Sequence, residues 1–379
     1  MKMKLYFLLP LLFITNFSIY AQDTTKIKKS DSEECGFSGG GVLFDEDYLM
    51  DWFIKDVNKD RDYTGGFALT FSGKFIESGR INILQKGVDY LFGLKKIHDE
   101  RKPHNNHSLK LSQTVFSPQG KNLNITYPIY DDRPYASIAT FSTSTTSIDS
   151  GKTKALTTEF AIGAFGWNWG EVSQAYIHSL KRECDTCRPY DPVGWDNQIS
   201  NGGEFVFQYN VSSKNLLCTG LFAYGRQVSK FKLFDVFVSR DLYLGHYTAV
   251  GASITGRVGV IRSNWGLFSS SPFGADAEAL GKLNQGKRNF ELYLFSTLRP
   301  KLIAYNAALQ GLTQTSVHVF NSSQINHFAV QFEGGIGLTC FHVMSVNLVY
   351  AHRTPEFKGP KGLSHDWLGI YLVFHSPFY

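Results

Sequence analysis

A series of short segments in which apolar and polar residues alternate constrains the fold of this chain more than any other feature. In one segment Phe67, Leu69 and Phe71 alternate with smaller or polar neighbours. Successive side chains of a strand point to opposite faces, so this pattern predicts strands with one apolar and one polar face. About twelve such strands are expected, at 42–48, 67–72, 109–115, 137–146, 156–165, 204–211, 216–226, 247–260, 290–303, 328–339, 343–352 and 367–379.

Composition narrows the class of fold. Aromatic residues make up 15% of the chain and there are 35 glycines, but no segment after the N-terminal leader has 18 continuous apolar residues. A helical membrane protein is therefore excluded. The sequence predicts an all-β fold, a transmembrane antiparallel β-barrel of about 12 strands with long extracellular loops, one of which carries a short helix. A soluble β-sandwich is the alternative.

The N-terminus has the pattern of a secretory signal peptide. Two lysines precede an apolar stretch from Leu5 to Ile14, and cleavage is expected after Ala21. We expect residues 1–21 to be the signal peptide, residues 22–37 a mobile polar arm, and residues 38–379 a barrel in the outer membrane of a Gram-negative cell.

The connections between the expected strands fall into two sets. Short inner turns are predicted at Ser212–Lys214 and near Phe341. Two inner connections, at 74–107 and 262–288, are long for a barrel, and the apolar spacing from Ile81 to Ile97 predicts a helix in the first. Long outer loops are expected at about 49–62, 118–133, 167–201, 229–246, 305–326 and 354–365.

A helix is predicted in the loop that follows the strand at 156–165, because apolar residues recur there at helical spacing from Val172 to Leu180. Gln174 and His178 lie four residues apart and share one face of this helix. An imidazole with a pKa near neutrality is a candidate general base. The alternative is an ordinary surface histidine, since loops carry most exposed polar residues.

Acidic residues gather where several strands meet the outer loops, in the segments 45–48, 60–66 and 131–136. In the expected register these segments and His178 lie at the same rim of the barrel. Carboxylate and hydroxyl oxygens favour Ca²⁺ or Mg²⁺ over zinc. The sequence therefore predicts a hard-cation site beside a base, and the alternative is a polar rim that binds nothing.

Five cysteines are present, and two of them, Cys184 and Cys187, form a C-x-x-C motif after the predicted helix. In an oxidising compartment this motif is interpreted first as a local disulfide. A zinc site or a redox motif are alternatives, but the second ligand pair and the thioredoxin-like context that they require are not evident. Cys218 and Cys340 fall in expected strands of the barrel wall.

Four strings together carry a resemblance to a known family: D-x-D-Y-T-G at 60–65, Y-D-D-R-P-Y-A-S at 130–137, G-x-x-x-Q-x-x-x-H at 170–178, and G-W-D-N-Q at 194–198. They resemble the outer-membrane lipid A 3′-O-deacylases, a family of twelve-stranded barrels. The resemblance runs from about Gly41 to Tyr379. It implies hydrolysis of the ester-linked acyloxyacyl group at the 3′ position of lipid A, with a calcium ion in the oxyanion hole and a histidine that activates water.

The resemblance assigns the metal ligands to the end of the first strand and the base to the loop helix. Asp47 matches the family's acidic ligand, whereas Glu46 stands where the family has asparagine. Thr64, Gln174 and His178 match catalytic positions.

Other family positions match less directly. The carboxylate that orients the histidine corresponds to Glu183 or Asp185, which the C-x-x-C insertion displaces. Tyr63 and Arg133 match substrate-binding positions. Leu123 and Asn124 occupy the positions of a basic pair in the family. Lys121 and Arg133, which lie nearby in the sequence, are therefore the expected contacts for the substrate's phosphates.

Lipid A or lipopolysaccharide is thus the expected substrate, with the active site at the extracellular face. The formal net charge of +5 suits an anionic glycolipid. The bilayer is the other expected partner, a monomer is expected, and no nucleic acid is. Two alternatives are an esterase that acts on another membrane lipid and a non-catalytic barrel, which the glutamate at 46 and the missing basic pair would favour.

Overall fold

The computed structural model describes residues 37–47, 62–73, 76, 80–98, 105–119, 126–180, 193–224, 227–271, 290–340 and 344–375. The expected signal peptide and nearly all of the expected arm lie outside these residues, as do Cys35, Cys184 and Cys187. Cys218 and Cys340 are free thiols on strands, as expected.

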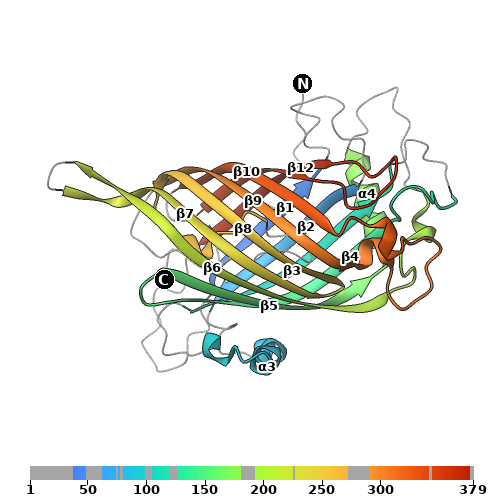
Figure 1. The fold of residues 1–379 in the computed structure, drawn as a ribbon, viewed down its shortest axis with the longest axis horizontal. Coiled ribbons are helices and arrows are strands. Elements are labelled where there is room, and N and C mark those ends of the chain that lie inside the picture. Colours follow the sequence, from blue (N-terminus) through green and yellow to red (C-terminus); the bar gives the residue numbers. More distant parts are fainter. Residues whose placement is uncertain are drawn as a thin grey trace, which may run out of the picture. The chain divides into compact units, whose positions relative to one another are not determined.

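Twelve antiparallel strands close into a barrel in which each strand pairs with its neighbours in sequence and β1 pairs with β12. Figure 1 shows the barrel with α4 at one end, here called the α4 end, and the β6–β7 hairpin at the other. The strands are β1 (Phe37–Glu46), β2 (Asp62–Gly73), β3 (Asn105–Ser117), β4 (Ala136–Ile148), β5 (Lys154–Phe165), β6 (Glu204–Tyr224), β7 (Gln227–Gly245), β8 (Tyr247–Ile261), β9 (Phe290–Asn306), β10 (Phe328–Cys340), β11 (Met344–Arg353) and β12 (His365–His375).

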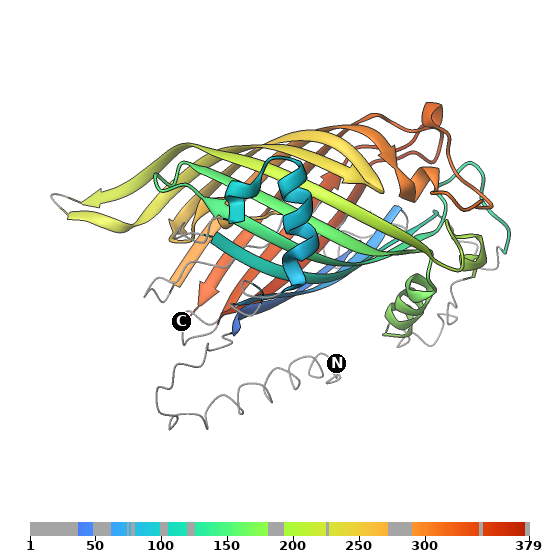
Figure 2. The same cartoon turned by 90° about the horizontal axis from the view of Figure 1, so that it is seen from below.

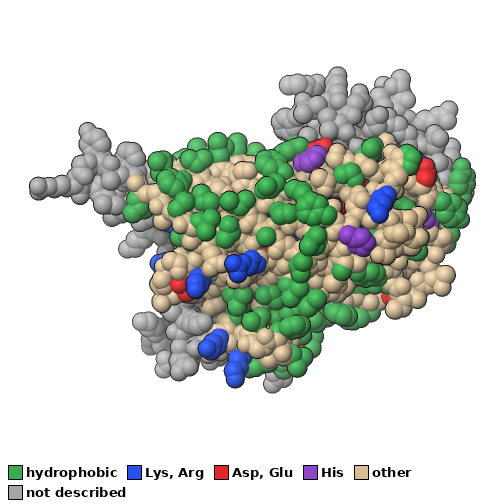
Figure 3. Space-filling model, in the orientation of Figure 1, with side chains coloured by type: hydrophobic (Ala, Val, Ile, Leu, Met, Phe, Trp, Pro, Cys, Tyr) green, Lys and Arg blue, Asp and Glu red, His purple; other side chains and the backbone are tan. Residues whose placement is uncertain are grey.

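The alternation seen in the sequence is the alternation between the two faces of this wall. In β9 Phe290, Leu292 and Leu294 are exposed on the outer face, whereas Glu291 and Tyr293 are buried in the lumen. Hydrophobic side chains spread over the outer surface in Figure 3. Apolar outward and polar inward residues are what a barrel surrounded by hydrocarbon requires, so the predicted fold class is confirmed.

One part of the predicted strand order is wrong. The sequence pattern predicts two strands, at 204–211 and 216–226, joined by a turn at Ser212–Lys214, but Glu204–Tyr224 form the single strand β6. The expected outer loop at 229–246 is mostly β7. The reason is that the polar residues point into the lumen: Ser212 donates a hydrogen bond to Asp241 (2.7 Å), and the buried Lys214 donates one to the Phe268 carbonyl (2.8 Å).

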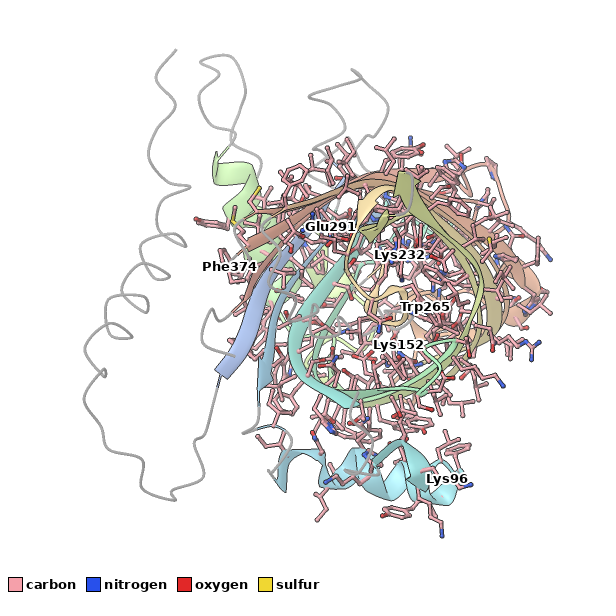
Figure 4. All side chains as sticks on the ribbon, turned by 90° about the vertical axis from the view of Figure 1, so that its left-hand side faces the viewer. Lys96, Lys152, Lys232, Trp265, Glu291 and Phe374 are labelled. Carbon is pink, nitrogen blue, oxygen red and sulfur yellow. The ribbon has the colours of Figure 1, made fainter. Side chains whose placement is uncertain are left out.

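The segment after β8 folds back into the barrel and fills one end of the lumen. Figure 4 looks into that end and shows Trp265 inside the ring of strands. Trp265 and Phe268 belong to one buried cluster with side chains from around the wall, among them Leu43, Phe237 and Tyr371. Arg257 adds a bidentate pair with Asp235 at 2.8 and 2.6 Å. The interior is therefore packed by residues 262–271, the described part of the long inner connection.

The helices are short, and the 3₁₀ turn that contains Trp265 lies inside the lumen (Figure 4). They are α3 (Ile83–Leu91), flanked by the 3₁₀ turns η3 (Arg80–Asn82) and η4 (Lys95–His98), then α4 (Trp169–Leu180) and α5 (Ala307–Gln310), with further 3₁₀ turns η5 (Trp195–Asn197), η6 (Trp265–Leu267) and η7 (Ser322–Gln324). The helices predicted in 81–97 and after Gly170 are thus confirmed. No helix in the described part of the chain is long and apolar enough to cross a membrane.

Candidate functional site

The helix α4 packs on the outer face of the wall over β3 and β4. The Ser173 hydroxyl donates a hydrogen bond to Gln113 Oε1 at 3.1 Å. Gln113 and Ser117 are four residues apart on β3, so their side chains lie on the same face, roughly 14 Å apart along the strand. The outer face of β3 thus contacts α4 at Gln113 and reaches the rim of the barrel at Ser117.

Gln174, a predicted site residue, holds α4 to the loop that follows it. Its Oε1 accepts a hydrogen bond from Trp195 Nε1 at 2.9 Å, and both side chains are buried. The Trp195 ring lies 4.7 Å from the ring of Tyr135. Gly170 allows the close contact, because a Cβ there would lie 2.5 Å from the Trp195 ring and 2.7 Å from Ser137 Cβ.

An apolar groove of about 650 Å³ lies on the same outer face, beside the start of α4. Outward-facing side chains of alternate strand positions line its floor, among them Phe67, Leu111, Phe141 and Ile162, and Trp169 of α4 borders it. Because the groove opens on the surface that faces lipid, an acyl chain can occupy it without leaving the apolar phase.

The predicted metal ligands lie where β1 meets β2 at the α4 end. Asp47 is 1% exposed and Glu46 4% exposed. The backbone amide of Asp47 donates to the Thr64 carbonyl at 3.4 Å, and Glu46 pairs with Gly65 across the strands. Gly65 makes room for the carboxylate, because a Cβ at that position would lie 2.9 Å from Glu46 Oε2. The backbone of Asp47 and Glu46 thus lies beside Thr64 and Gly65 at one point of the rim, and their role as metal ligands stays a prediction.

Thr64 is placed by a β-bulge. In the pairing of β2 with β3 the register shifts between Tyr63 and Gly65, so that Thr64 is the extra residue. Its hydroxyl lies 2.6 Å from the Ser117 hydroxyl. Bulges of this kind redirect a side chain next to functional sites. Here Thr64 and Tyr63, at the register shift, have different hydrogen-bond partners, Ser117 and Asp45.

Tyr63 and Arg133 belong to a network in the lumen and not to the groove. Tyr63 donates a hydrogen bond to Asp45 at 3.2 Å and packs on Trp367. Arg133 is 1% exposed, lies 3.4 Å from the Glu356 carboxylate and stacks 4.3 Å above the Phe116 ring. The structure therefore brings neither side chain to the groove, and their roles as substrate contacts stay predictions.

The pKa values of the two aspartates before Arg133 are shifted in opposite directions. A hydrogen bond from Lys361 at 2.9 Å lowers the pKa of Asp131. Burial raises the pKa of Asp132, although the backbone amides of Arg133 and Gln119 donate to it at 2.8 and 2.7 Å. Asp132 thus fixes the loop before β4 through its backbone contacts.

Several predicted residues lie outside the described atoms. The backbone of His178 lies in the last turns of α4, but its side chain is not described, and Glu183, Asp185 and Lys121 fall outside altogether. Sequence reasoning missed Ser117 and Gln113, which have no motif around them. Trp195 could have been identified from the sequence, since it lies in the G-W-D-N-Q string.

Comparisons with known proteins agree with this architecture. The model of the family described as "Outer membrane protein LpxR" matches residues 7–374. LpxR from Salmonella typhimurium has a similar structure, with a TM-score of 0.64 and 17% identity over 89% of this chain and 100% of that chain. The β-domain of the Bordetella autotransporter BrkA gives a TM-score of 0.37 at 8% identity, over 89% of this chain and 98% of that one. No curated protein matches the sequence.

The Salmonella structure supports the fold alone at this level of identity. The family match is stronger evidence, because it extends over nearly the whole sequence, from residue 7 to residue 374 in the last strand. It confirms the family indicated by the four sequence strings. The chain belongs to the outer membrane protein LpxR family.

Proposed function

We propose that this barrel is a lipid A deacylase that hydrolyses the 3′-linked acyloxyacyl ester, with its active site at the extracellular face. One observation carries the proposal: α4, which bears Gln174 and His178, packs on the outer wall beside an apolar groove large enough for acyl chains. An enzyme that acts on a lipid still in the membrane needs its catalytic groups on this outer face.

In this proposal the rim residues would hold a calcium ion. Glu46 and Asp47 offer two buried carboxylates, and Gly65 leaves space in front of one of them. In the described part of the chain, no group of three or more His, Cys, Asp or Glu side chains could hold a metal ion. The other ligands would then be backbone carbonyls, hydroxyls and water, which calcium accepts readily. Bound there, calcium would polarise the ester carbonyl and stabilise the oxyanion.

The protein's own groups would supply the remaining chemistry. His178 would accept a proton from the attacking water and return it to the leaving alcohol. Glu183 or Asp185 would orient the imidazole. The Gln174–Trp195 hydrogen bond would fix the rotation of α4 and so the position of His178. Lys121 and Arg133 remain the proposed contacts for the phosphates of lipid A.

A pore is the less favoured alternative. Trp265 and Phe268 pack across the lumen against residues of β1, β7 and β12, and buried ion pairs such as Arg257–Asp235 fill the space around them. A channel needs an open polar path, whereas this interior is closed at the end opposite α4.

Mass spectrometry of mixed vesicles tests the proposal. The purified protein, supplied with calcium, is incubated with vesicles that contain both lipid A and phosphatidylethanolamine. Loss of the 3′ acyloxyacyl mass from lipid A, with phospholipid unchanged, is the expected result. Hydrolysis of the phospholipid instead would support the alternative esterase, and no hydrolysis of either lipid would support the non-catalytic barrel.

A further inference from the structure

In α3 polar residues are buried and apolar residues are exposed, the reverse of a helix on the surface of a soluble protein. Its buried residues are the polar Gln85 and Asp89. Its apolar residues face away from the barrel: Ile83 is 65% exposed and Leu91 is 86% exposed. A surface helix in water normally buries its apolar stripe against the core and turns its polar face outward.

The polar face of α3 is bonded to the outer side of the wall. Gln85 Nε2 donates to Thr145 Oγ1 at 3.1 Å and to Thr158 Oγ1 at 3.0 Å. Asp89 accepts hydrogen bonds from Thr158 Oγ1 at 3.0 Å and Tyr209 OH at 2.5 Å. Figure 2 shows α3 lying across the outside of these strands, and Figure 4 shows it outside the ring.

The wall under α3 is polar where the rest of the wall is apolar. Thr145, Thr158 and Tyr209 are outward-facing positions of β4, β5 and β6 and are buried beneath the helix. The corresponding outward positions of β9, such as Leu292 and Leu294, are exposed apolar residues. The helix therefore covers a polar patch of the outer wall and presents apolar side chains in its place.

The C-terminal end of the segment carries positive charge. Lys95 and Lys96 in η4 are exposed, and the side chain of Lys96 points away from the barrel in Figure 4. The one acidic residue between 80 and 98 is Asp89, which is buried. Thr145 is three residues from the end of β4, so α3 crosses the wall near the end away from α4. An apolar face with lysines at its edge is the pattern of a helix at the lipid–water interface.

We propose that α3 is an interfacial membrane helix of the leaflet away from α4. Its apolar face lies among phospholipid acyl chains, Lys95 and Lys96 lie at the level of the phosphate headgroups, and Gln85 and Asp89 seal its polar face onto the wall. In hydrocarbon a polar face without partners is costly, so the hydrogen bonds to β4, β5 and β6 make this placement possible.

Fluorescence quenching tests the position of the helix. Leu91→Trp protein is reconstituted into vesicles of phosphatidylethanolamine and phosphatidylglycerol, and the signal of the six native tryptophans is subtracted with the parent protein. Lipids brominated on the acyl chain should quench the added tryptophan, and aqueous acrylamide should not. Tyr127→Trp, at an exposed loop position before β4, is the matched control and should show the reverse. Tyr90→Trp replaces Leu91→Trp if the latter does not assemble.

Equal acrylamide quenching of Leu91→Trp and Tyr127→Trp would overturn the proposal, because it would place the apolar face in water. Protection of Leu91→Trp from both quenchers would overturn it as well, since a protein partner would then cover the face. The outcome does not depend on whether the barrel hydrolyses lipid A.

Discussion

A single methyl group at Gly170 should separate catalysis from folding. The Cβ of Gly170→Ala would lie 2.5 Å from Trp195 Cη2 and 2.7 Å from Ser137 Cβ. Because carbon atoms in contact are normally about 3.5–4.0 Å apart, α4 has to move from the wall by about 1 Å. A displacement of this size at a catalytic group can lower a rate about 10²-fold, and overpacking costs about 1–3 kcal/mol locally.

The assay compares lipid A deacylation with assembly of the barrel. Turnover is measured by mass spectrometry, and folding by the shift in gel mobility between heated and unheated samples. Gly87→Ala is the matched control, because no atom of the described part lies within 4 Å of a Cβ there and alanine is the better helix former by about 1 kcal/mol. It should retain full activity.

Gly170→Ala protein that folds and works at the wild-type rate would refute this reasoning. It would show that contact of α4 with Trp195 and the wall does not position the catalytic group. Loss of folded barrel in Gly170→Ala would refute it too, since α4 lies outside the closed sheet and should not be needed for strand pairing.

Three further predictions address the metal, the groove and the lumen. Gly65→Ala should raise the calcium concentration needed for half-maximal activity by displacing the Glu46 carboxylate; an unchanged calcium titration would count against this pair as ligands. Ala164→Trp, in the groove lining, should slow hydrolysis of long acyl esters more than of short ones, and equal slowing of both would mean that acyl chains do not use the groove. Trp265→Ala combined with Phe268→Ala should raise single-channel conductance in planar bilayers without changing deacylation, whereas a conducting wild-type barrel would contradict the packed interior.

The strand positions were predictable wherever apolar residues faced lipid. Phe67, Leu69 and Phe71 predict β2, because they form an apolar outer face while the residues between them, on the inner face, are small or polar. The prediction failed in β6 and β7, where lumen-facing residues such as Lys214 and Asp235 are buried and paired. A charged residue in the lumen and one in an exposed loop look alike in a sequence, so a long polar strand was mistaken for a turn and a loop.

The end of the barrel at which the candidate residues lie was predictable, but the directions of their side chains were not. The expected strand register put Asp47, Thr64 and the loop helix at one end of the barrel, where the structure also has them. The bulge after Tyr63 is a local departure from alternation, so the separation of Tyr63 from Thr64 depends on strand pairing. Helical spacing likewise predicted α3 but not its inverted orientation, which depends on what Gln85 and Asp89 meet on the wall.

The most direct test of the central claim is the rate of lipid A deacylation by wild-type and His178→Asn proteins across the pH range. The account predicts loss of the 3′ acyloxyacyl group by the wild type, at a rate that rises with pH as the imidazole of His178 loses its proton. The variant should be slower by about 10²–10⁴-fold with its barrel intact. A His178→Asn protein that releases acyl chains at the wild-type rate, or a wild type that leaves lipid A unchanged, would contradict the account.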